Sequence, residues 1–438
     1  MPMGIEPTAA TGQTAPAALQ RRTALALMAG LGGLSTWALL PRTGQAAAAS
    51  TRPNNATHTN NATHTNSATL AAAWEAQGSF HIGLLSVAGL QLRVQAALEV
   101  PSRPHGVVAL PDGSVLAVAR RPGDWMVRWH PGRHTAPLWR WQTAEAAFPD
   151  RTFNGHVLAG PDGQTLYTTE TDVETGASLV GVRDARTLEK VAEWPTHGMD
   201  AHELIWDRHS ASSKTGAPTL IVANGGVPTA PETGRAKRDM HRMDSSLVRL
   251  DGTTGELLGQ WRLDDPRLSL RHLAWNPAGT VLGIALQAEH DDPALRHAAP
   301  VHARFDGQAL HAEPQVGHSA QTGASALAEA PVPPVQAPTN LQGYGGSIVA
   351  TPEGWAVSCP KAGCAVLFNA QGLRTGQIAL AEVCALASDG ARLWAGGLGQ
   401  SLLLQRVPGA PVSTQALTHP GALHQARLDN HWGLVQAV

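Results

Sequence analysis

Short apolar stretches recur along this chain, and each runs into a Pro-Asp-Gly or equivalent turn that is followed by a second apolar stretch. Three copies are clear, beginning at His105, His156 and His272, with turns at Pro111-Asp112-Gly113, Pro161-Asp162-Gly163 and Pro277-Ala278-Gly279. Units of strand, turn and strand that repeat every several tens of residues are typical of a β-propeller, because one four-stranded sheet cannot bury both faces without neighbours. The pattern therefore predicts an all-β fold.

Seven candidates for the innermost strand of a blade can be placed, so we predict a seven-bladed β-propeller of the YVTN/WD40-like type, with six or eight blades as the alternatives. They begin near His105, His156, His202, His272, Gly346, Cys384 and His424. The last unit stops after about two strands, and Phe80–Val87 and Gln91–Val100 are expected to complete it from the other end of the chain. A blade shared by both ends leaves no open sheet edge. Another all-β sandwich with Asp-Gly hairpins is the alternative fold.

The first 77 residues carry targeting and spacer signals. Arg21-Arg22 precedes an uncharged run and then small residues suited to cleavage, so we predict a twin-arginine (Tat) signal peptide over residues 1–49, with a Sec signal or an uncleaved anchor as alternatives. The tandem hexapeptide Asn-Ala-Thr-His-Thr-Asn predicts a disordered tether over 50–77. The propeller is expected over 78–438, with an Ala- and Pro-rich loop inserted at about 319–340. The expected location is the periplasm, with no membrane span after cleavage.

Charge excludes one class of partner. The chain has 32 basic and 34 acidic residues, a net charge of -2, and no basic stripe that would follow a phosphate backbone. We therefore expect no nucleic-acid partner.

Several motifs together resemble those of the domain of unknown function 1513 family. They are Thr169–Gly176, His197-Gly198, His202-Glu203-Leu204, Val222–Gly226, Gly234–Leu247, Arg271-His272-Leu273 and Asp429-Asn430-His431. The resemblance covers the chain from about Phe80 to Val438 and implies an exported bacterial propeller. It also implies a link to iron, because members are commonly encoded beside imelysin-like periplasmic proteins thought to handle iron. Such iron-uptake proteins are the implied partners, and the resemblance implies no particular activity.

Histidines open four of the seven innermost strands. Because innermost strands line the channel of a propeller, the rings of His105, His156, His202 and His272 are expected to converge near its axis. Imidazole binds transition metals through a neutral nitrogen, so we predict a metal site with iron or copper as the ion. The alternative is structural, with each histidine hydrogen-bonded to a turn of the neighbouring blade.

Further polar residues of the family motifs are candidates for binding a ligand at the same mouth. They are Glu170, Asp172, His197, Glu203, Asn224, Arg235, Lys237 and Arg271. Glu170 and Asp172 share one face of a strand and either hold a hard cation or end a solvated loop. The basic loop that contains Arg235 and Lys237 suits an acidic ligand or partner, or is simply solvated.

The three cysteines add a redox expectation. Cys359 and Cys364 flank Pro-Lys-Ala-Gly and should face each other across a hairpin, where an oxidising periplasm favours a disulfide. Cys384 is left alone on an innermost strand. The sequence has no Cys-x-x-Cys-His, Gly-x-Ser-x-Gly or Walker pattern.

These observations predict a periplasmic propeller that binds a ligand or partner protein at its channel mouth, in iron acquisition and without catalysis. The alternative is a metal-dependent enzyme on a propeller, either a lactonase-like hydrolase or an oxidoreductase.

Overall fold

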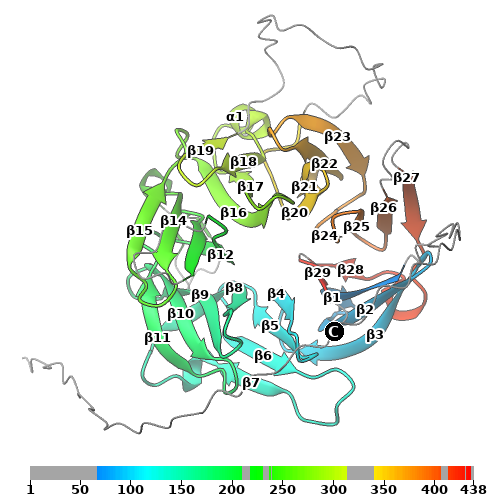
Figure 1. Cartoon of the computed structure of the whole chain (residues 1–438), viewed down its shortest axis with the longest axis horizontal. Helices are drawn as coiled ribbons and strands as arrows, with labels where there is room; N and C mark the ends of the chain where they lie inside the picture. Colours follow the sequence, from blue (N-terminus) through cyan, green and yellow to red (C-terminus); the bar gives the residue numbers. More distant parts are fainter. Residues whose placement is uncertain are drawn as a thin grey trace, which may run out of the picture. The chain divides into compact units, whose positions relative to one another are not determined.

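The computed structural model of the protein describes residues 67–209, 218–229, 236–237, 239–312, 340–405, 413–429 and 431–435. Among these residues the strands form seven antiparallel sheets, which follow one another around a common axis in the unit Thr63–Val438 (Figure 1). The chain is thus an all-β, seven-bladed β-propeller, as the repeats predict. The predicted signal peptide, residues 50–66, Arg235 and residues 319–339 lie outside the described residues. No helix in the described part of the chain is long and apolar enough to cross a membrane.

Six blades are each built from four consecutive strands, ordered from the axis outwards except where noted. The first three are β4 (Pro104–Ala109), β5 (Val115–Ala119), β6 (Trp125–Trp129) and β7 (Leu138–Trp141); β8 (Arg151–Ala159), β9 (Thr165–Asp172), β10 (Ser178–Asp184) and β11 (Lys190–Pro195); and β12 (Ala201–Trp206), β13 (Thr219–Asn224), β14 (Ser246–Asp251) and β15 (Leu257–Trp261). The next three are β16 (Leu268–Trp275), β17 (Leu282–Ala288), β18 (His302–Phe305) and β19 (Leu310–Ala312); β20 (Ile348–Thr351), β21 (Gly354–Cys359), β22 (Cys364–Asn369) and β23 (Arg374–Ala379); and β24 (Ala385–Ser388), β25 (Arg392–Gly396), β26 (Ser401–Gln405) and β27 (Ser413–Leu417). The described helical segments are short: η1 (Gln142–Ala144), η3 (Met240–Arg242), α1 (Pro293–Ala298), η4 (Pro360–Ala362) and η5 (Gly421–Leu423).

The seventh blade joins the two ends of the described chain. Its order is β28 (Arg427–Leu428), β1 (Ser67–Ala76), β2 (Ser79–Ala88) and β3 (Gln91–Val100), and β29 (Gly433–Leu434) also pairs with β1. The predicted sharing of one blade is therefore confirmed. The predicted division is wrong, because the N-terminal side supplies three strands and the C-terminal side only the innermost line.

Strand β1 also corrects the predicted tether, since 67–76 belongs to the propeller. Leu70, Ala72 and Trp74 pack into a core shared with the blade of β24–β27, whereas Ala71 and Ala73 pack into a core shared with the blade of β4–β7. A strand that is buried on both faces shows a continuous apolar run instead of alternation. Here that run is mostly alanine, which made it look like low-complexity spacer.

The turns of the repeat behave as the sequence predicts. Asp112 accepts a hydrogen bond from the backbone nitrogen of Ser114 at 3.0 Å, and Gly113 has a φ of +81°. Asp162 and Gly163 form an equivalent turn between β8 and β9, with a φ of +66° at the glycine. Because left-handed φ values are costly for residues with a Cβ, glycine is the expected residue there.

Indole hydrogen bonds connect successive blades near the axis. Trp206 Nε1 donates to the Ala159 carbonyl at 2.8 Å, Trp275 Nε1 donates to the Trp206 carbonyl at 2.9 Å, and Trp355 Nε1 donates to the Ala274 carbonyl at 2.8 Å. Each ring buries apolar area while its N–H is satisfied by the preceding blade. This repetition sets neighbouring innermost strands at a common height around the channel.

The cysteine hairpin also has the predicted register. Cys359 and Cys364 are direct partners in the pairing of β21 with β22, and both are buried. All three cysteines are free thiols in this structure.

Candidate metal centre at the propeller axis

The four predicted histidines converge. Their ring centroids are 4.7 Å apart for His105 and His156, 4.8 Å for His156 and His202, and 4.5 Å for His202 and His272. They come from β4, β8, β12 and β16, the innermost strands of four successive blades. The structure thus brings together side chains that are separated by up to 167 positions in the sequence.

A local irregularity aims each of these histidines. In all four innermost strands the pairing with the next strand shifts register around the histidine: between Pro104 and Val107, Phe153 and Val157, Ala201 and Leu204, and Leu270 and Leu273. A β-bulge leaves residues unpaired and turns their side chains away from the regular direction. Repetition of the bulge therefore explains why equivalent histidines point toward a common centre.

Close approach of the first two of these strands depends on glycine. A Cβ on Gly155 would lie 2.7 Å from His105 Cδ2, and its φ is +106°. A side chain there would push β8 away from β4 or displace the imidazole of His105.

A fifth histidine, His431, joins the cluster and was missed from the sequence. Its ring centroid is 4.2 Å from that of His272 and 5.0 Å from those of both His105 and His156. It lies between β28 and β29 with a left-handed φ of +63°. The sequence analysis placed the start of this innermost strand near His424 and treated Asp429–His431 only as a family motif. The signal that could have found it is a histidine inside the last innermost strand.

Four of the five histidines form a set suited to one ion. One ligand nitrogen from each of His105, His156, His272 and His431 lies within 4.8 Å of the others. A metal–imidazole bond is about 2.0–2.1 Å, so opposite ligand nitrogens must approach to roughly 4 Å. The required contraction is therefore less than about an ångström. His202 is outside this set, and its Nε2 lies 2.8 Å from His272 Nε2, within hydrogen-bonding distance.

The environment keeps these rings neutral. Burial, reinforced by the mutual repulsion of neighbouring cations, lowers the pKa of His105, His202 and His272 well below the ordinary value. Burial and the nearby His431 do the same for the pKa of His156, and burial lowers the pKa of His431 to about 4. A neutral imidazole is the form that binds a metal.

Several of the converging nitrogens have nothing to bind. Within the described part of the chain, both ring nitrogens of His105 and the Nε2 atoms of His156 and His431 are buried without a hydrogen-bond partner. An unsatisfied buried polar atom costs roughly 1–3 kcal/mol, so native structures contain few of them. Several such atoms at one point indicate a bound species that completes the site.

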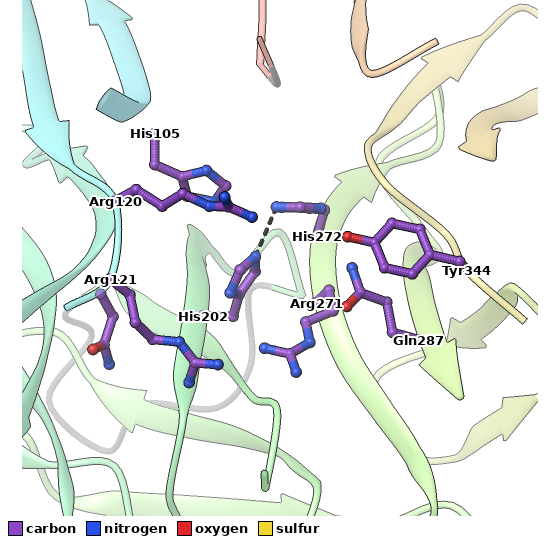
Figure 2. Close-up of a pocket in the computed structure, with 9 residues that line it drawn as sticks. His105, Arg120, Arg121, His202, Arg271, His272, Gln287 and Tyr344 are labelled. Atoms are coloured by element: carbon purple, nitrogen blue, oxygen red, sulfur yellow. Dashed lines mark hydrogen bonds between the residues drawn. The ribbon is translucent and has the colours of Figure 1, made fainter. Parts of the chain in front are cut away.

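A hollow adjoins the cluster and encloses about 380 Å³ not filled by protein atoms. Its lining is polar: His105, Arg120, Arg121, Asn154, His202, Arg271, His272, Gln287 and Tyr344. Figure 2 shows the guanidinium of Arg120 and the hydroxyl of Tyr344 directed toward the histidine rings. Sequence analysis identified Arg271 in this lining but missed Arg120, Arg121 and Tyr344, which lie outside any recognisable motif.

Two of the arginines share one carboxylate below the cluster. Arg271 Nη1 is 2.9 Å from Asp200 Oδ2, and Arg121 pairs with the other oxygen of the same side chain. Arg271 Nη2 also lies 3.9 Å from Glu289, which in turn pairs with Lys237. Lys237 is therefore engaged in an ion pair next to Arg271, although it does not line the hollow.

Glu203 lies beside the histidines. Its Oε1 is 3.9 Å from His156 Nδ1, and its Oε2 accepts a hydrogen bond from the backbone nitrogen of Leu273 at 2.7 Å. Burial raises the pKa of Glu203 to about 8, so the carboxyl group is mostly protonated at neutral pH. It can therefore offer a proton next to the cluster.

Glu170 and Asp172 do not face the channel mouth, contrary to expectation. Glu170 is fully buried inside its blade, 2.7 Å from Arg183 Nη2 and 2.8 Å from Lys190 Nζ. Burial alone would raise its pKa, but these two cations outweigh that effect and hold the pKa at about 2. Asp172 pairs with Arg151 at 3.0 Å. Protein cations already fill the place where a hard metal ion was considered.

His197 and Asn224 also lie outside the hollow. The His197 side chain is exposed, and its carbonyl accepts a hydrogen bond from Gln260 Nε2 at 3.0 Å. Asn224 Nδ2 donates to the Thr196 carbonyl at 2.9 Å and to Ser246 Oγ at 3.2 Å. Both residues thus connect loops next to β13.

Comparison with known proteins gives the family. The family described as protein of unknown function (DUF1513) matches residues 98–435, which is most of the chain, so this protein belongs to that family. A search of the curated proteins returned no match. Among solved structures, the Dos1 propeller has a TM-score of 0.47 and 9% identity over 82% of this chain and 86% of that chain. A chain of the nidogen/laminin complex has a TM-score of 0.39 and 10% identity over 72% of this chain and 93% of that chain.

Proposed function

We propose that this DUF1513 propeller is a periplasmic metal-binding protein that holds one transition-metal ion at its axis through His105, His156, His272 and His431. The observation that supports this most strongly is the convergence of buried ring nitrogens that have no partner among the described residues. His202 would support His272 from behind through the contact between their Nε2 atoms. Such outer partners orient ligand rings and raise metal affinity.

Donor chemistry narrows the choice of ion. A set made only of neutral imidazoles suits copper, iron, nickel and zinc, and disfavours magnesium and calcium, which prefer oxygen ligands. By the general order of affinities, copper(II) should bind most tightly in a test tube. Iron is the ion that the gene association of the family favours. Iron acquisition, with imelysin-like proteins as partners, stays a prediction.

The experiment is metal loading of the purified protein. Separate samples are incubated with copper(II) and, without oxygen, with iron(II), then passed through a desalting column and analysed by mass spectrometry of the metals. We expect one ion per chain, lost in His105→Ala and His431→Gln. His311→Ala changes an exposed histidine on β19 and serves as the matched control. Loading that is equal in all four proteins would contradict the proposal.

A metal-dependent enzyme is the second candidate. The hollow next to the cluster leaves room for a substrate, and Glu203 is a nearby group that can carry a proton at neutral pH. An open coordination position beside an acid or base is what hydrolytic and redox metal sites require. Loaded protein should then turn over lactones or reduced substrates, and Glu203→Gln should lower the rate while metal content stays at one ion per chain.

A further inference from the structure

We infer that the hollow beside the histidines binds a small anion of carboxylate or phosphate type together with the metal, as part of one site. This inference rests on the proposed metal site and specifies the class of its second ligand.

Positive charge dominates the hollow. Its charged lining side chains are Arg120, Arg121 and Arg271, and no carboxylate is among the lining residues. Asp200 balances Arg121 and Arg271 together, and Glu289 is shared between Arg271 and Lys237. One carboxylate therefore serves two guanidinium groups directly below the cluster.

A metal ion would add to this excess. The proposed ligands are neutral imidazoles, so they bring no negative charge to a divalent cation. Even with Asp200 and Glu203 both ionised, the metal and the three arginines would outnumber the negative groups. Uncompensated charge in a buried site is costly, because the low effective dielectric weakens its solvation. An anion in the hollow removes that cost, so metal and anion should stabilise each other's binding.

The hollow also has the donors that recognise such an anion. A guanidinium is planar and matches the paired oxygens of a carboxylate or phosphate group. Arg271 is buried, and its Nε lacks a hydrogen-bond partner within the described residues. The hydroxyl of Tyr344 is directed into the same space, and its residue bridges Gln287 on β17 (Figure 2). A space of about 380 Å³ fits a small molecule.

The test measures metal affinity with and without anion. Copper(II) is titrated at fixed free-ion levels set by a chelator, in a non-coordinating buffer alone, with inorganic phosphate, and with succinate. We expect either anion to tighten metal binding by about tenfold or more, and the metal to tighten binding of that anion by the same factor, because such coupling is reciprocal. The phosphate and succinate arms show which of the two chemistries the hollow prefers.

Two variants give opposite signs for the two ligands. Arg120→Gln removes a positive charge near the metal, so it should tighten metal binding in plain buffer and abolish most of the anion effect. Arg271→Lys keeps the charge, loses the planar donor pair and should weaken the anion effect. Arg262→Gln, in an exposed ion pair with Asp244, is the matched control and should change neither. If metal binds and neither anion changes its affinity, the inference is wrong and the proposed function stands. If no metal binds, both are wrong.

Discussion

Two arcs of the ring differ in how their innermost strands pair. Five consecutive innermost positions, those of β28/β29, β4, β8, β12 and β16, each contribute a histidine to the axis, and we name them the histidine arc. The other two, β20 and β24, pair with their neighbours without any register shift and contribute none; we name them the regular arc. The bulges are thus confined to the strands that carry site residues.

The difference shows where a propeller has freedom to build a site. Interblade packing constrains the middle of every innermost strand, because it is buried on both faces. The first residues of the strand, at the channel mouth, can leave the ladder without emptying the core. A bulge there costs one or two hydrogen bonds, each worth about 1 kcal/mol net, and redirects a side chain toward the axis. One side of the mouth has been changed in this way and the other has kept regular pairing.

Removing the central ring should give the largest effect. The ring of His105 contacts those of all four other histidines, at centroid distances of 4.7–5.8 Å. We expect His105→Ala to weaken metal binding by more than about 100-fold, since loss of a supporting group alone costs 10–100-fold. Cys384→Ala, just before β24 in the regular arc, is the control and should leave the affinity unchanged. Chelator competition measures both, and equal losses would remove the distinction between the arcs.

Acid should weaken the histidine arc selectively. Its histidines have folded-state pKa values below the unfolded value of 6.5, so the unfolded chain takes up protons first. The stability they allow is complete above about pH 6.5 and is lost as the pH falls toward the folded values, about 4 for His431. That residue alone accounts for up to about 3 kcal/mol.

Urea unfolding at pH 7.5, 6.5 and 5.5 measures this loss, in a range where most carboxylates stay ionised. His431→Gln should flatten the dependence. His302, buried in the blade of β16–β19 with its pKa lowered to about 3, should leave a residual slope. A flat profile in the unmodified protein would show that the rings are not held neutral by burial.

The junction of the two chain ends should rank third. Arg103, just before β4, makes two hydrogen bonds to Asp429, just after β28, at 2.7 and 2.6 Å. Asp429→Asn should destabilise the fold by about 2 kcal/mol, because it weakens a largely buried charged pair. It should also weaken metal binding, since His431 is two residues away. Asp244→Asn breaks the exposed pair with Arg262 and should cost under about 1 kcal/mol. Equal midpoints in urea for the two variants would contradict this ranking.

The smallest expected effect separates two tryptophans. Trp355 Nε1 donates to the Ala274 carbonyl, which ties the regular arc to the histidine arc. Trp394 Nε1 has no partner within the described residues, and both rings are fully buried. Trp355→Phe should therefore cost about 1 kcal/mol more than Trp394→Phe in urea unfolding, the net value of one hydrogen bond. A difference near zero would mean that packing alone joins the arcs.

Local chemistry made much of this protein readable in advance. The turns at Asp112-Gly113 and Asp162-Gly163 follow from φ values that favour glycine, and the interval between them follows from blade size. Four of the five axial histidines were found because they open strands whose apolar pattern is unmistakable. Closure of the ring by both ends follows from the short last unit.

Other features depend on long-range contacts that leave no local pattern. β1 is an alanine-rich run that becomes a strand only because two neighbouring blades cover its two faces. Glu170 looked like a ligand, but Arg183 and Lys190 from later strands neutralise it. His431 and Arg120 reach the site because the ring closes and because separate blades meet at one mouth. Strand and turn identity depend on neighbours in sequence, whereas the convergence, charge and burial of the site depend on residues that only the folded ring brings together.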